Sequence, residues 1–167
     1  QLSHDEGFDA CWTTEQGNVY VGSLDGGQQS YSSVQSGWSL YLVDSVTPSN
    51  ASSLVDCALA VNEDGRQYVL YADGSNLKSA HIAYSNSVFS ELSWQKITIR
   101  YDVGPTDIEM VLLPNQLEYA VFRDVNGSLW QLNYSGNLWY HDLLDVGPIG
   151  HSIELEMDDK GVAHLLY

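Results

Sequence analysis

The chain has 167 residues, 44% of them hydrophobic, which is enough for one globular domain with a continuous core. Its net charge of −16 comes from a shortage of basic residues, six in all, so nucleic acid and anionic lipid are excluded as partners. No apolar run approaches the length of a membrane span, so we expect no membrane insertion.

Short strand patterns separated by turns recur along the chain. The clearest is a strand with tyrosine near its start, which occurs at 18–25, 66–73 and 117–124. A fourth copy at 162–167 has histidine in place of the tyrosine. Before each copy comes a turn, preceded by a strand that begins with an apolar residue and an acid. After the tyrosine strand come a turn, a third strand, and a fourth strand with a tryptophan near its start.

Four short strands in a repeat of about 45 residues are typical of one β-propeller blade. We therefore predict an all-β, β-propeller-like array of about three and a half four-stranded antiparallel blades in a single domain, 1–167. The blades span about 8–46, 54–100 and 107–145, and a half-blade covers 152–167. A β-sandwich is the alternative, but a sandwich has no reason to repeat tyrosine, tryptophan and acid in phase.

One segment of the third repeat carries a family resemblance. Residues 128–140 read Ser-Leu-Trp-Gln-Leu-Asn-Tyr-Ser-Gly-Asn-Leu-Trp-Tyr and resemble a blade of the fungal and bacterial fucose-binding lectins. The other strands resemble those of propeller proteins in general. The resemblance implies a propeller fold and carbohydrate binding. Sites of that family would also need an arginine beside the tryptophan, whereas Arg66, Arg100 and Arg123 stand at unlike repeat positions.

An acid opens the innermost strand of each repeat, in one register that we expect at a mouth of the central channel. The four acids are Asp9, Asp56, Glu109 and Glu154. They suit three roles: acceptors of hydrogen bonds from loop amides, a calcium site, or the carboxylate pair of a glycoside hydrolase. Equivalence in every blade favours the first role, because catalysis needs carboxylates with different environments. We expect no cofactor, with calcium as the alternative.

The repeated tryptophans, Trp38, Trp94 and Trp139, also allow two interpretations. A tryptophan at a fixed blade position packs between blades, which is the more common use. Alternatively, the exposed ring of such a residue can stack against a sugar.

Two features favour an extracellular protein. Cys11 lies two residues after Asp9, whereas Cys57 lies one residue after Asp56, so the two thiols point to opposite faces of adjacent blades and meet in one gap. We predict that they form a disulfide, which requires an oxidising compartment. The sequence also contains three acceptor triplets for N-glycosylation, at Asn50, Asn126 and Asn133.

The half-blade suggests a function. Its last strand, with Val162, Leu165, Leu166 and Tyr167, would present an unpaired apolar edge, and such edges pair with other chains. Either the chain is a fragment of a larger propeller, or other chains complete it. On the second interpretation we predict a non-enzymatic extracellular assembly module that binds copies of itself as an oligomer or filament. The alternatives are a propeller lectin that binds glycans and a glycoside hydrolase.

Overall fold

The structure, a computed structural model, is an all-β array of antiparallel sheets. It describes residues 8–14, 16–24, 38–45, 56–62, 66–73, 76–82, 94–101, 104–115, 117–135, 138–147 and 152–167. These residues form thirteen strands and no helix. In chain order the strands are β1 (Phe8–Thr13), β2 (Asn18–Leu24), β3 (Trp38–Ser45), β4 (Cys57–Val61), β5 (Gln67–Asp73), β6 (Asn76–Ile82), β7 (Trp94–Arg100), β8 (Thr106–Leu112), β9 (Glu118–Arg123), β10 (Leu129–Ser135), β11 (Leu138–Asp145), β12 (Glu154–Met157) and β13 (Ala163–Leu166). No helix in this part of the chain is long and apolar enough to cross a membrane.

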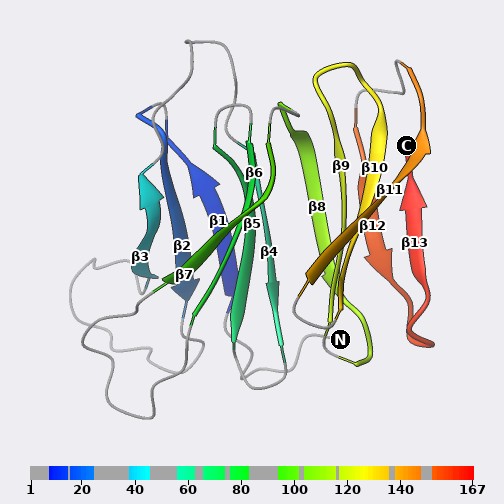
Figure 1. Cartoon of the computed structure of the whole chain (residues 1–167). Helices are drawn as coiled ribbons and strands as arrows, with labels where there is room; N and C mark the ends of the chain where they lie inside the picture. Colours follow the sequence, from blue (N-terminus) through cyan, green and yellow to red (C-terminus); the bar gives the residue numbers. More distant parts are fainter. Residues whose placement is uncertain are drawn as a thin grey trace.

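The strands form four sheets that follow one another along the chain. Their orders are β1-β2-β3, β4-β5-β6-β7, β8-β9-β10-β11 and β12-β13. The sheets stand side by side (Figure 1), and their first strands contact in succession, β1 with β4, β4 with β8 and β8 with β12. This arrangement is the propeller-like array predicted from the repeats, and we call the sheets blades 1 to 4.

Blade 1 differs from the prediction in one respect. Its outermost strand β3 pairs directly with β2, so in the described residues this blade has three strands. In blades 2 and 3 the strands that begin at Trp94 and Leu138 are separated from the second strand by β6 and β10. Trp38 therefore begins the third described strand of its sheet, whereas β7 and β11 are the fourth strands of theirs.

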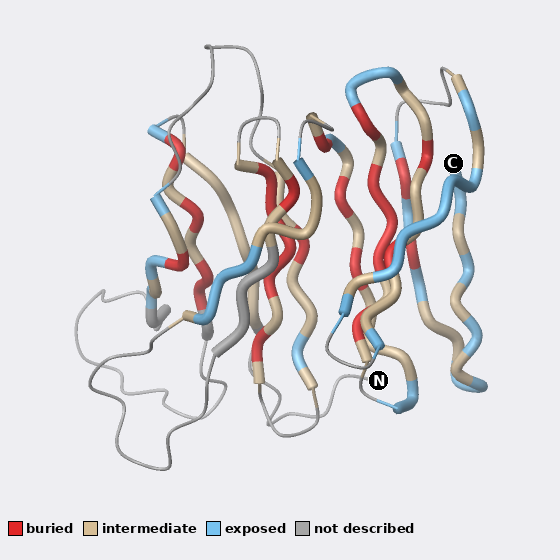
Figure 2. Tube along the Cα trace, in the orientation of Figure 1, coloured by how far each residue is buried: buried red, intermediate tan, exposed pale blue. Residues whose placement is uncertain are grey.

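Three apolar cores fill the junctions between successive blades. The first-junction core includes Val19, Val21 and Tyr71, and the second includes Leu77, Phe122 and Leu132. The third-junction core consists of four buried side chains, Val121, Leu129, Ile153 and Leu155. Figure 2 shows the buried residues concentrated on the inner strands, whereas β11 is mostly exposed. Each blade therefore presents one face to the preceding blade and the other to the next.

The repeated tyrosine of the second strand does not face the same way in every blade. Tyr68 and Tyr119 pack against the core that their blade shares with the next one. Tyr20 alternates with Val19 and Val21, which face blade 2, so it lies on the opposite face, stacked on Trp12 at 5.9 Å. Because side-chain direction alternates along a strand, Tyr20 faces away from the next blade, although it holds the same place in the sequence repeat as Tyr68 and Tyr119.

A side-chain acceptor organises the tight turns. Asp124 Oδ1 accepts hydrogen bonds from the N–H groups two and four residues later, at 2.9 Å each, and Asp158 Oδ1 does the same at 2.9 and 2.8 Å. The glycine three residues after each acid has positive φ, 81° and 76°, which a residue with a side chain rarely adopts. This geometry explains the recurring glycine of the predicted turns.

The predicted disulfide is present. Cys11 of β1 is bonded to Cys57 of β4, with the Cα atoms 6.3 Å apart. It links the innermost strands of blades 1 and 2 beside the first-junction core.

Candidate functional site

The outermost strands of blades 1 to 3 share a local irregularity at their ends. In each, one residue bulges from the ladder and a charged residue follows it. Val43 precedes Asp44, Ile99 precedes Arg100, and Leu144 precedes Asp145. A bulge re-aims the residues around it, and each charged side chain points into the junction with the next blade.

At the first junction Asp44 is the centre of a charged network. Its Oδ2 accepts a hydrogen bond of 2.7 Å from the Tyr71 hydroxyl, and its Oδ1 accepts one of 2.7 Å from Lys96 Nζ. Lys78 lies 3.7 Å away and also pairs with Asp73. Burial alone would raise the pKa of Asp44, but the bonds from Lys96 and Tyr71 and the two lysine charges outweigh it and lower the pKa. Asp44 therefore stays ionised at neutral pH.

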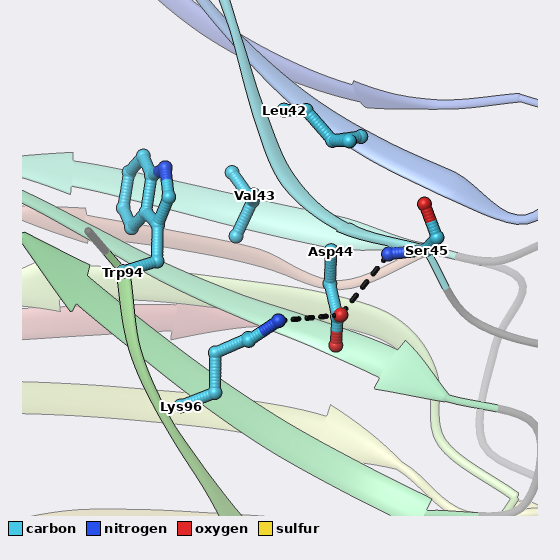
Figure 3. Close-up of a pocket in the computed structure, with 6 residues that line it drawn as sticks. All are labelled: Leu42, Val43, Asp44, Ser45, Trp94 and Lys96. Carbon is cyan, nitrogen blue, oxygen red and sulfur yellow. Dashed lines mark hydrogen bonds and ion pairs between the residues drawn. The ribbon is translucent and has the colours of Figure 1, made fainter. Parts of the chain in front are cut away.

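A groove of about 390 Å³ opens beside this network. Leu42, Val43, Asp44 and Ser45 of β3 form one wall, and Trp94 and Lys96 of β7 form the other. In Figure 3 the Trp94 ring stands at one end of the groove and the Asp44–Lys96 pair at the other. The groove thus combines an aromatic ring, a charged pair and an exposed leucine, since Leu42 is 50% exposed.

At the second junction the charged residue after the bulge also contacts the next blade, but its partner there is an aromatic ring. The Arg100 guanidinium lies 3.9 Å above the Trp130 ring, a cation–π contact, instead of meeting an acid. The Trp130 indole N–H donates to Asp124 at 3.0 Å, and His141 lies beside the ring, 6.1 Å between centroids. Trp139 packs against the core of this junction.

At the third junction the charged residue has fewer partners. The Tyr167 hydroxyl donates to Asp145 Oδ2 at 3.4 Å. Blade 4 has two strands in the described residues, and the outer edge of β13 is unpaired there. Of the predicted edge residues, Val162, Leu166 and Tyr167 are exposed, whereas Leu165 packs against the third-junction core.

Two of the four acids of the innermost strands bond to the next blade. Asp9 accepts a hydrogen bond of 2.9 Å from Gln67 of blade 2, and Asp56 accepts one of 2.7 Å from the N–H of Ile108 in blade 3. They lie at different levels of the ladders, opposite Ser23 and Ala72 respectively. Asp9 and Asp56 are thus hydrogen-bond acceptors across the first and second junctions.

Two of these acids have raised pKa values. Burial raises the pKa of Asp56 despite two backbone hydrogen bonds. Burial, and then the charges of Asp56, Glu154 and Asp107, raise the pKa of Glu109. Glu154 lies on the exposed outer face of blade 4. No group of three or more histidine, cysteine, aspartate or glutamate side chains in the described ranges is arranged to hold a metal ion.

The three repeated tryptophans lie at different places in the array. Trp94 packs against the first-junction core and Trp139 against the second. Each is partly buried, and neither indole N–H has a hydrogen-bond partner within the part of the chain that the structure describes. For Trp38 only the backbone position, opposite Leu24 in the ladder, is described.

The glycosylation triplets lie in different settings. Asn126 is exposed in the turn between β9 and β10, and Asn133 is half-buried on β10, opposite Tyr140. Asn50 lies outside the described residues.

Sequence reasoning did not single out Asp44, Lys96 or Arg100 as junction residues. A signal was available, because Asp44, Arg100 and Asp145 each follow a repeated tryptophan by six residues. The partners of these three residues, by contrast, lie on the next blade, and their distance along the sequence from the charged residue does not identify them.

No protein-family model matches the chain, and no curated protein matches it. Among solved structures, the chain is similar to a fucose-specific lectin from Aleuria aurantia in its mercury-derivative form, with a TM-score of 0.49 and 10% sequence identity. The match covers 88% of this chain and 48% of the lectin, so the chain spans about half the length of that protein. The structural likeness is therefore weak, and it is to a fucose-specific lectin.

Proposed function

We propose that the chain is a non-catalytic carbohydrate-binding module and that the sugar occupies the groove at the first junction. The observation that carries this proposal is the combination of Trp94 with the Asp44–Lys96 pair in one open groove. A sugar presents an apolar C–H face, which stacks on an indole, and hydroxyl groups, which bind charged donors and acceptors. The volume of about 390 Å³ lies in the range of small-molecule sites.

The roles within the groove follow from the contacts. Asp44 accepts hydrogen bonds from Tyr71 and Lys96, so it holds Lys96 in place. Lys96 is 41% exposed and has further N–H groups to donate to a sugar hydroxyl. Leu42 and Trp94 supply apolar surface on the two walls.

The test is a glycan array followed by titration calorimetry on the intact chain with each sugar that binds. Lys96→Ala should weaken binding by about tenfold, or about 1.4 kcal/mol, and Trp94→Phe should also weaken it. Lys160→Ala is the matched control, because Lys160 is an exposed lysine in the β12–β13 turn, away from the groove. The proposal is wrong if no sugar binds, or if binding is the same in Lys96→Ala and Lys160→Ala.

A second candidate function is self-association of copies of this chain. It is supported by exposed apolar residues on the outer faces of the first and last blades, Leu40 at 59%, Val162 at 51% and Leu166 at 68%. Internal junctions join unlike blade faces, so one copy's blade 4 would meet another copy's blade 1. Sedimentation velocity over a concentration series tests this. Leu166→Lys should lower the association, whereas Val125→Lys, in an exposed turn, should not. A chain that is monomeric at every concentration would rule out this candidate.

We also propose that the chain is secreted. The disulfide between Cys11 and Cys57 supports this, since such bonds persist in oxidising compartments. Mass spectrometry of material from the native source should find this bond and a glycan on at least one of Asn50, Asn126 and Asn133. Free thiols with unmodified asparagines would contradict it.

A further inference from the structure

The carboxylate beside the first-junction groove is already occupied by protein donors. Asp44 Oδ1 accepts hydrogen bonds from Lys96 Nζ at 2.7 Å and from the backbone N–H of Ser45 at 3.0 Å. Asp44 Oδ2 accepts a hydrogen bond from the Tyr71 hydroxyl at 2.7 Å and lies 3.7 Å from Lys78 Nζ. Each oxygen therefore has two protein neighbours, and the groove offers a ligand little carboxylate surface as an acceptor.

The lysine of the groove, by contrast, has donors to spare. In the described residues Lys96 directs one of its three N–H groups to Asp44, and its side chain is 41% exposed, so two N–H groups remain for a ligand. The Ser45 hydroxyl, which also lines the groove, donates to Asn18 Oδ1 at 2.9 Å. A ligand that supplies strong acceptors fits these groups better than one that supplies hydroxyl donors.

Positive charge is concentrated at this groove in an otherwise acidic chain. The chain has three lysines, and two of them, Lys78 and Lys96, pair with Asp44. Because Lys78 also pairs with Asp73, two cations balance two anions there. The net charge of −16 repels anions at long range, but salt at 0.1 M screens that repulsion over about 10 Å, whereas contact with Lys96 is local. Charge therefore does not exclude an anionic ligand, and the unused N–H groups favour one.

We propose that the ligand of this groove is an acidic sugar, a hexuronic acid residue whose carboxylate binds Lys96 while its ring stacks on Trp94. The inference rests on the proposed carbohydrate binding and specifies the class of sugar. Trp94 and Lys96 are two residues apart on β7, and both line the groove (Figure 3). Residues with this spacing share one face of a strand and lie roughly 6.6 Å apart along it. That separation is close to the width of one monosaccharide, so a single sugar residue reaches both.

A hexuronic acid differs from its neutral hexose at one group. It carries a carboxylate where the hexose carries a hydroxymethyl group. The carboxylate only accepts hydrogen bonds, and its bond with an ammonium group is roughly twice as strong as a bond between neutral groups. A matched pair of such sugars therefore isolates the contact with Lys96, since stacking on Trp94 is the same for both.

The probe is a glycan array on which each hexuronic acid glycan stands beside its carboxyl-reduced form. Titration calorimetry on the intact chain then measures both members of each pair that binds. We expect the acid to bind about tenfold more tightly than the reduced form. Lys96→Gln, which keeps N–H donors but loses the charge, should make the two affinities equal, whereas Lys96→Arg should preserve the difference. Lys160→Gln is the matched control and should change neither affinity.

The outcomes separate this inference from the proposed function. If the reduced forms bind as tightly as the acids, or if only neutral glycans bind, the sugar is not acidic, and the carbohydrate-binding proposal stands without this inference. A preference for the acid that survives in Lys96→Gln would also overturn the inference, because the carboxylate would then lie elsewhere. If no glycan of either kind binds, the proposed function is wrong and the inference is wrong with it.

Discussion

The hydrogen bond from Tyr71 to Asp44 allows a quantitative test of the junction design. The Tyr71 ring is fully buried, and its hydroxyl lies 2.7 Å from an ionised carboxylate. Hydrogen bonds to charged groups contribute roughly 1.5–3 kcal/mol. In Tyr71→Phe the ring still fills the core and Asp44 keeps its two lysines, so we expect the lower end, about 1.5 kcal/mol. For a chain of this size that loss lowers the melting temperature by roughly 3–6 °C.

The matched control is Tyr167→Phe, at the equivalent place on the next-but-one blade. Tyr167 is 51% exposed and its hydroxyl lies 3.4 Å from Asp145, so its loss should change stability by less than about 0.5 kcal/mol. Urea unfolding with the disulfide intact measures both variants, and the midpoints are compared at constant slope.

The same pair has a defined dependence on pH. The folded pKa of Asp44 lies below its ordinary value of 3.8, so its stabilisation is present above that value and is lost as pH falls through the folded pKa. The difference between the natural chain and Tyr71→Phe should therefore shrink on acidification from about pH 7 to about pH 2. If Tyr71→Phe costs no more than Tyr167→Phe, or if its cost is the same across this range, the charged network does not stabilise the junction.

Three further predictions concern the rest of the array. Cys57→Ser removes the Cys11–Cys57 bond, which closes a loop of about 46 residues in the unfolded chain. Without that loop the unfolded chain gains entropy, so the free energy of unfolding should fall by about 4 kcal/mol, and unchanged urea unfolding would contradict this. Glu109→Gln should raise the free energy of unfolding at neutral pH, because the folded pKa of Glu109 is raised and its charged form is disfavoured. The gain should vanish below the unfolded pKa, near 4.5. A loss of stability at neutral pH would argue against repulsion among the acids. Asp124→Ala removes the acceptor of three hydrogen bonds at a nearly buried position and should cost about 2–3 kcal/mol by thermal unfolding, whereas equal melting curves would show that the turn does not need it.

The repeat itself was readable from the residues. The spacing of acids and tryptophans predicted the array of blades, because each blade must bury the same kinds of side chain against its neighbours. The parity of Cys11 and Cys57 relative to the adjacent acids predicted the disulfide, which the structure contains. The first inference depends on repeat spacing and the second on strand alternation, and the sequence records both directly.

Register and the identity of partners depended on packing between blades. Tyr20 matches Tyr68 in the sequence repeat but faces the other way, because Val19 and Val21 fill the first-junction core. Leu165, predicted at an exposed edge, packs inward, whereas Leu166 faces outward. The three bulges turn Asp44, Arg100 and Asp145 into the junctions, and only the neighbouring blade decides whether each meets a lysine, a tryptophan or a tyrosine. A bulge adds one residue to one strand and reverses the faces beyond it. The spacing after each tryptophan marks the three charged residues, but the partner of each is set by three-dimensional fit between sheets.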